Sequence, residues 1–259
     1  MRPLSLFSTF HPPKLLVGLT TIFLSNLSMA QQTLFNVSSA DITPKNKSFY
    51  QHQLNFYSIQ KMEFNAHIVY GLGKGWDAGM NLVDLPIWLG QQPFISINDN
   101  NSHKPLYPLL MFSVQKQWVL REDKFTLTTG TQIGPNLSFD ISKTQIAMMN
   151  YSLVRWQFSK RGYVIGGPYH TNDVFVGGHQ NNFGLMLGYE YNFKKRWVIM
   201  GDFISGGHEK SKTVIGGGYN ISERVQLFLG SLLGFPNHSL SNGVILELNW
   251  YGWGHIKVH

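Results

Sequence analysis

The 259-residue chain contains no cysteine, which excludes disulfides and lipid attachment at an N-terminal cysteine. Its stability must therefore come from packing and backbone pairing. Charged residues are only 14% of the chain, against roughly a quarter in a typical soluble domain. Hydrophobic residues nevertheless reach only 43%. Beyond the first thirty residues no run is apolar enough to cross a bilayer as a helix. The composition therefore disfavours a helical membrane protein.

The first thirty residues carry the pattern of a secretory signal peptide. Arg2 and Lys14 precede the apolar run 15–24, and the small residues Ser28 and Ala30 precede Gln31. The run has about half of the roughly 20 residues that a spanning helix needs. We predict that residues 1–30 are cleaved after Ala30, which lowers the formal charge from +7 to +5 by removing two cations. We interpret the polar residues 31–48 as an N-terminal periplasmic extension.

From residue 49 onward, apolar and polar side chains alternate. In the clearest hairpin, 64–82, apolar side chains occupy every second position on both sides of the glycine-containing turn 71–75. A period of two places the two sets on opposite faces of a sheet. In 144–158 the apolar residues change phase, which predicts a bulge. We predict strands near 49–58, 62–70, 76–84, 107–118, 125–134, 144–158, 162–168, 182–193, 197–205, 212–221, 225–234 and 242–252. A ten-stranded sheet, without 49–58 and 162–168, is the alternative.

The connections between these strands alternate between tight and long, apart from the short first link near 59–61. Outer-membrane barrels place short turns in the periplasm and long loops outside, and aromatic residues at the strand ends are typical of a membrane-interface girdle. We therefore predict an all-β fold, in which residues 49–259 form a closed antiparallel up-and-down transmembrane β-barrel with both termini periplasmic. A soluble β-sandwich is the alternative, although sandwiches lack this loop pattern. The tight links lie at 71–75, 119–124, 159–161, 194–196 and 222–224, and the long ones at 85–106, 135–143, 169–181, 206–211 and 235–241.

On each strand, the polar and charged side chains alternate with the apolar ones. We expect them to point into the barrel, because a charged side chain that faces lipid is energetically costly. They could line a path for a solute. Alternatively, they could form a hydrogen-bonded network that fills a narrow lumen. These lumen-lining candidates are Gln53, His67, Asp77, Asn81, Gln115, Gln132, Glu190, Asp202 and Glu247.

Other candidate sites are weaker in the sequence. A hydrolase built on Ser205 and His208, with Asp84 or Asp140, is an alternative, although no recognisable signature surrounds these residues. Five loop histidines match no compact metal-ligand spacing, so we predict no metal and no cofactor. The cationic excess is too diffuse for nucleic acid. The five histidines are His103, His170, His179, His208 and His238.

Two glycine-rich hairpins, 70–79 and 216–226, resemble those of outer-membrane porin and transporter-like barrels, among them barrels associated with aromatic-compound degradation. The resemblance implies a barrel fold and passive uptake of small molecules, and it transfers no site residue. These barrels usually finish on a terminal aromatic residue, whereas Trp253 is followed by six more residues.

We expect an outer-membrane channel for passive passage of small solutes that performs no chemistry. Its partners would be the solute and the lipid and lipopolysaccharide of the outer membrane. The alternative is a plugged barrel that binds a surface partner or lipopolysaccharide through its long loops.

Overall fold

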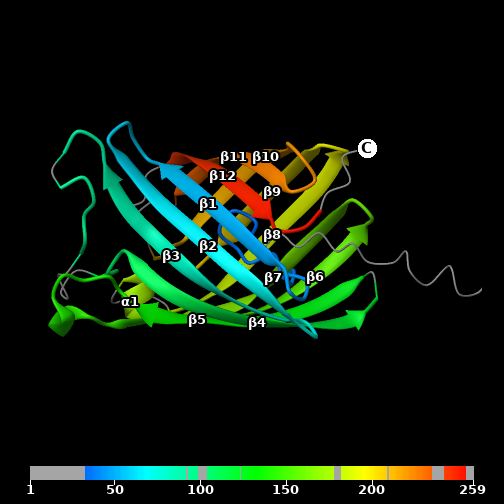
Figure 1. Cartoon of the computed structure of the whole chain (residues 1–259), viewed down its shortest axis with the longest axis horizontal. Helices are drawn as coiled ribbons and strands as arrows, with labels where there is room; N and C mark the ends of the chain where they lie inside the picture. Colours follow the sequence, from blue (N-terminus) through cyan, green and yellow to red (C-terminus); the bar gives the residue numbers. More distant parts are fainter. Residues whose placement is uncertain are drawn as a thin grey trace, which may run out of the picture.

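The computed structural model describes residues 33–91, 93–98, 104–122, 124–177, 182–208, 210–234 and 242–254. Twelve antiparallel strands form a closed barrel in which each strand pairs with its sequence neighbours and β1 pairs with β12 (Figure 1). The strands are β1 Ser48–Phe56, β2 Lys61–Gly73, β3 Trp76–Trp88, β4 Leu109–Arg121, β5 Phe125–Pro135, β6 Ile146–Ser159, β7 Gly162–Thr171, β8 Phe183–Lys194, β9 Trp197–Ile204, β10 Lys212–Asn220, β11 Val225–Gly234 and β12 Gly243–Tyr251. The predicted fold class and the twelve strands are confirmed. The predicted signal peptide lies outside the described residues.

The alternation of side chains follows the predicted phases. In β8, Phe183 and Leu187 are exposed on the outer surface, whereas Met186 and Glu190 are buried inside. Of the bulge predicted within 144–158, the structure shows only a register shift against β7 between Gln157 and Ser159, because β6 pairs with β5 in one continuous register from Ile146 to Trp156. The phase changes there because apolar residues of β6 face inward at one end and outward at the other.

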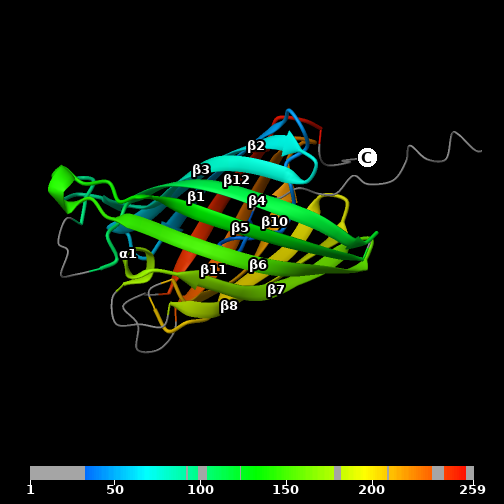
Figure 2. The ribbon, with the colours of Figure 1, turned by 90° about the horizontal axis from the view of Figure 1, so that it is seen from below.

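The two ends of the barrel differ as predicted. Four tight turns and the link 221–224 connect strands at one end, where β1 begins and β12 ends. Figure 2 shows the longer connections gathered at the opposite end, together with α1 (Asp173–Val176). This end also carries the 3-10 helix η1 (Ile141–Lys143) and the short link 57–60. In the described part of the chain, no helix has the length and apolarity needed to cross a membrane.

Residues 33–47, here named the plug, lie inside the barrel (Figure 1). Four apolar plug residues, Leu34, Phe35, Val37 and Ala40, are at most 1% exposed and belong to the main core cluster. The interpretation of 31–48 as an N-terminal periplasmic extension therefore needs one correction, because residues 33–47 lie in the barrel interior. The correction has a physical reason: a twelve-stranded barrel leaves an interior that must be filled by water or by chain.

The inner wall of the barrel has two different sides. The inward residues of β6 to β11 are largely apolar, and Leu153, Met200 and Phe228 among them are fully buried. The inward residues of β1 to β5 are mostly polar, as with Gln51 and Asn81. The main core cluster therefore joins the plug to the apolar wall and also includes residues of β3, β4 and α1.

Candidate functional site

The plug is held by carboxylates of the barrel wall that accept hydrogen bonds from its backbone. Asp202 of β9 accepts from the amides of Asn36 and Val37, the latter at 2.9 Å. Asp77 of β3 accepts from the amide of Thr43, also at 2.9 Å. Hydrogen bonds to an ionised acceptor are stronger than neutral ones. Two predicted lumen residues thus fix the plug at positions where it has no secondary structure to satisfy its amides.

A second set of contacts surrounds Ala40 and Asp41 of the plug. The carbonyl oxygen of Ala40 accepts from Thr128 Oγ1 at 2.9 Å and from Gln117 Nε2 at 2.6 Å. The side chain of Asp41 forms an ion pair with Arg155 of β6. Burial raises the pKa of Asp41 from its ordinary value of 3.8 to about 7, although the Arg155 guanidinium acts in the opposite direction. The proton of Asp41 is thereby linked to the position of the plug.

On the apolar wall, glycines make room for two plug side chains. A Cβ added at Gly188 of β8 would lie 2.1 Å from Leu34 Cδ1. A Cβ at Gly230 of β11 would lie 2.9 Å from Phe35 Cζ. The Phe35 ring meets Phe228 edge-on, with ring centroids 6.3 Å apart. The wall is therefore shaped around the plug, because ordinary side chains at these positions would displace it.

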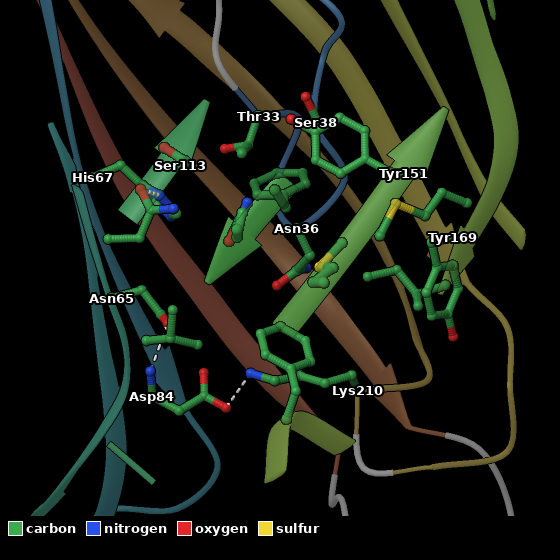
Figure 3. Close-up of a pocket in the computed structure, with 18 of the residues that line it drawn as sticks. Thr33, Asn36, Ser38, Asn65, His67, Asp84, Ser113, Tyr151, Tyr169 and Lys210 are labelled. Atoms are coloured by element: carbon green, nitrogen blue, oxygen red, sulfur yellow. Dashed lines mark hydrogen bonds and ion pairs between the residues drawn. The ribbon is translucent and has the colours of Figure 1, made fainter. Parts of the chain in front are cut away.

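A cavity of about 100 Å³ remains between the plug and the loop end of the barrel (Figure 3). The plug contributes Thr33, Asn36 and Ser38 to its lining, and α1 contributes Phe175 and Val176. At the loop end, residues of the 104–108 segment bond to α1: Leu106 N–H donates to Val174 O at 3.3 Å, and Tyr107 Oη donates to Phe175 O at 2.6 Å. The lumen is thus narrowed from both ends.

A cluster of charged residues lies at the loop end of the cavity. Lys210 forms an ion pair with Asp84, as the dashed line in Figure 3 shows. The Lys210 ammonium also lies 4.5 Å from the centroid of the Tyr107 ring, at a cation–π distance. Asn65 Oδ1 accepts from the Asp84 backbone amide at 2.8 Å. These contacts tie the β9–β10 loop to β3 and to the 104–108 segment.

The structure divides the nine predicted lumen residues into two groups. Six line the cavity: Gln53, His67, Asp77, Asn81, Gln115 and Gln132. The other three, Glu190, Asp202 and Glu247, are buried away from it. Glu190 accepts from Tyr163 Oη at 3.1 Å, and Glu247 accepts from Asn249 Nδ2 at 2.9 Å. Whether any of the nine lines a path for a solute stays a prediction.

Sequence reasoning missed the plug and its main side-chain partner. The sequence does not determine on which face of the sheet Arg155 lies, because β6 has apolar residues in both phases. Its side chain points inward and pairs with Asp41. One feature of the sequence could have indicated that the plug is buried. This feature is the apolar spacing Leu34-Phe35-x-Val37 within an otherwise polar stretch. Buried apolar residues in a segment without periodicity indicate packing against another surface, but they do not identify that surface.

The hydrolase candidates are engaged in other bonds. Ser205 Oγ accepts from the Leu185 amide at 2.7 Å, and His208 Nε2 lies 2.5 Å from Tyr169 Oη. Asp84 is paired with Lys210, and Asp140 caps η1 through Ser142. These bonds differ from the serine–histidine–carboxylate contacts that activate a nucleophile.

Among the residues that the structure describes, no group of three histidine or acidic side chains could hold a metal ion. Of the five loop histidines, His103, His179 and His238 lie outside those residues.

Comparison with known proteins supports the fold at the level of architecture. No protein-family model matches the chain, and no curated protein matches its sequence. Solved structures of outer-membrane porins do match. KdgM porin has a TM-score of 0.52 at 8% identity, over 79% of this chain and 98% of that one. NanC porin has a TM-score of 0.53 at 10% identity, over 80% and 100%. A KdgM porin in complex with disordered oligogalacturonate has a TM-score of 0.50 at 9% identity, over 79% and 98%.

The class defined by the fold is therefore a closed twelve-stranded antiparallel barrel similar to outer-membrane porins. At these identities the likeness concerns the fold alone.

Proposed function

We propose that the protein is an outer-membrane channel for small solutes whose lumen is closed by its own plug. The observation that carries the proposal is that the barrel is complete without the plug. β1 pairs with β12 over eight residue pairs, and no strand of the barrel comes from residues 33–47. The plug can therefore leave the lumen without breaking the barrel.

The contacts of the plug suit a reversible closure. Its backbone is bound to side chains of the wall through hydrogen bonds, each of which water can replace when the plug leaves. Among the residues that the structure describes, two backbone hydrogen bonds tie the plug to β2 near the turn end: Asn46 N–H donates to Gly71 O and Gly71 N–H donates to Lys47 O, both at 2.9 Å. These links form a hinge next to β1. Passage through the opened lumen would be passive, and selectivity would come from the lining and the loops.

The outer surface of the barrel supports the membrane location. Large apolar side chains such as Phe112, Leu185 and Leu229 are more than half exposed, as expected where lipid replaces water. Short turns on the periplasmic side would place both termini there, with α1 and the long loops outside the cell. Outer-membrane lipid and lipopolysaccharide would then surround the barrel.

A second candidate function is favoured by the filled lumen itself. A barrel that stays closed could present its long loops to a surface partner or to lipopolysaccharide, and the plug would then be a permanent core. The buried apolar side chains of Leu34, Phe35 and Val37 support this alternative, because their transfer to water is unfavourable.

Ion conductance in planar bilayers distinguishes the two functions. The chain from residue 31 onward is compared with the same chain lacking residues 33–43. The channel proposal expects rare, brief openings from the first and sustained, larger currents from the second. A deleted chain that folds, as judged by heat-modifiable migration on gels, but passes no current would contradict the channel and favour the closed barrel.

A further inference from the structure

Lys212, the first residue of β10, lines the cavity, and no carboxylate of the described part of the chain lies within ion-pair distance of its ammonium group. The residue is only 2% exposed and contributes to the lining of the cavity. Among the residues that the structure describes, no acceptor lies within hydrogen-bond or ion-pair distance of its ammonium group. An ammonium has three donors and no acceptor, so Lys212 presents unfilled donors to the cavity.

The neighbouring carboxylates are already engaged elsewhere. Asp84 pairs with Lys210. Glu63 accepts from Tyr57 Oη at 2.8 Å and lies 3.8 Å from Lys61 Nζ. Asp202, which also acts on Lys212 electrostatically, binds the amides of the plug. At the loop end, Lys61 and Lys210 each have a carboxylate within ion-pair distance, whereas Asp84, Glu63 and Asp202 act on Lys212 only from beyond that distance.

A buried ammonium without acceptors is costly unless an anion or ordered water satisfies it. The shape of the cavity favours an anion that carries an apolar part. One side is lined by apolar residues such as Met186 and Ile204, and the opposite side by polar ones such as Asn65 and His67. Binding sites for small molecules commonly combine an apolar wall with a few polar groups that fix orientation.

The size of the cavity limits what it can hold. Its volume is about 100 Å³, whereas a cavity of roughly 150 Å³ accommodates benzene. A carboxylic acid with two or three carbon atoms is therefore within range while the plug is in place, and larger acids would need the plug to move.

We infer that the cavity is a binding site for small organic carboxylates, with the carboxylate on Lys212 and the apolar body against Met186 and Ile204. The inference rests on the proposed function and deepens it, because it identifies anionic organic solutes as those that the lumen selects. The ion pair between Lys210 and Asp84 would hold the loop end of the site in place.

Titration calorimetry on the refolded chain from residue 31 onward tests the site with propionate as the probe. Propionamide is the neutral control of the same shape, and formate is the anion without an apolar body. Because a hydrogen bond to a charged group is at stake, propionate is expected to bind at least about tenfold more tightly than propionamide. It should also bind more tightly than formate. Equal binding of propionamide would overturn the role of Lys212, and equal binding of formate would overturn the apolar half of the site.

The variant Lys212→Met keeps the length and removes the charge, and it should bind propionate no better than propionamide. Lys143→Met, in the exposed η1, is the matched control and should bind as the unaltered chain does. Undiminished propionate binding by Lys212→Met would overturn the inference. If Lys212→Met does not fold, propionate binding by Lys212→Gln tests the role of Lys212 in its place. The comparison of the three probes on the unaltered chain tests the site without any variant.

Calorimetry measures propionate binding independently of ion conductance. The inference and the proposed function can therefore be contradicted independently. Lys212-dependent binding in a barrel that never conducts would contradict the channel alone. Conductance without propionate binding would contradict this site alone.

Discussion

We expect single side chains of the wall to control whether the plug stays in the barrel. Asp202 is the clearest case, because one carboxylate accepts from two consecutive plug amides, Asn36 and Val37. Its other oxygen is buried and has no hydrogen-bond partner among the residues that the structure describes. Such a carboxylate is tolerated inside a barrel when the amides that it binds have no other acceptor.

Asp202→Ala should therefore shift the plug toward release. The loss of two charge-assisted hydrogen bonds is expected to cost about 2 kcal/mol, or roughly a 30-fold larger released fraction. Because the chain has no cysteine, the buried Ser39→Cys reports release through its rate of reaction with a maleimide. Asp140→Ala, in the exposed loop at η1, is the control and should leave that rate unchanged. An unaltered rate in the Asp202 variant would show that this contact does not hold the plug.

The closed state should also weaken as the pH rises. The pKa of Asp41 is about 7 inside the barrel and 3.8 at its ordinary value, so the closed state binds more protons between these pH values. Its stabilisation is full below pH 3.8 and is lost as the pH rises through about 7. Arg155 and Glu190 are the charged groups that act on Asp41, and both stay in place.

The measurement is the open fraction of single-channel current at pH 5 and at pH 8. A larger open fraction at pH 8 is expected, and Asp41→Asn should remove the difference. A larger open fraction at pH 5 would show that the sign of this linkage is wrong.

At the scale of the element, the strands were predictable and the plug was not. Alternation depends on neighbouring residues of one strand, so β8 and β11 could be predicted from local sequence. The position of residues 33–47 depends instead on contacts with β3, β4, β6 and β9, which are distant in sequence. No local pattern records such contacts.

The candidate site was predictable in part for the same reason. Six of the nine predicted residues line the cavity because strand phase alone determines that their side chains point inward. Lys212 was missed because it is the first residue of its strand, where the phase is set by too few neighbours. The apolar phase change in β6 was misinterpreted as a bulge because an apolar plug was not anticipated.

The outer face of β8 supplies a test of the membrane assignment. Leu187, near the middle of the strand, is 48% exposed. If lipid surrounds it, Leu187→Arg should lower the free energy of unfolding by about 2–4 kcal/mol in phospholipid vesicles. Ile141→Arg, at a position that is 90% exposed in η1, should change it little. Equal effects of the two substitutions in urea titrations would contradict the assignment of the outer face to lipid.

For the whole molecule, the central relation is between a barrel that closes on itself and a segment that fills it. The barrel provides the hydrogen-bonded closure that a lipid environment requires. The plug and the loops around α1 narrow the lumen from opposite ends. We therefore propose two separate roles within one chain. The strands span the membrane, and residues 33–47 open or close the lumen.

A reversible crosslink between plug and wall tests this claim most directly. Ser38 Oγ and Gln115 Oε1 are 3.4 Å apart, so Ser38→Cys and Gln115→Cys can be joined by a short, reducible, bifunctional thiosulfonate, with Ser38→Cys alone as the control. The account predicts that the crosslinked barrel passes no current in planar bilayers and that reduction restores the openings of the untreated variant. Currents that are the same before crosslinking, after it and after reduction would contradict the account.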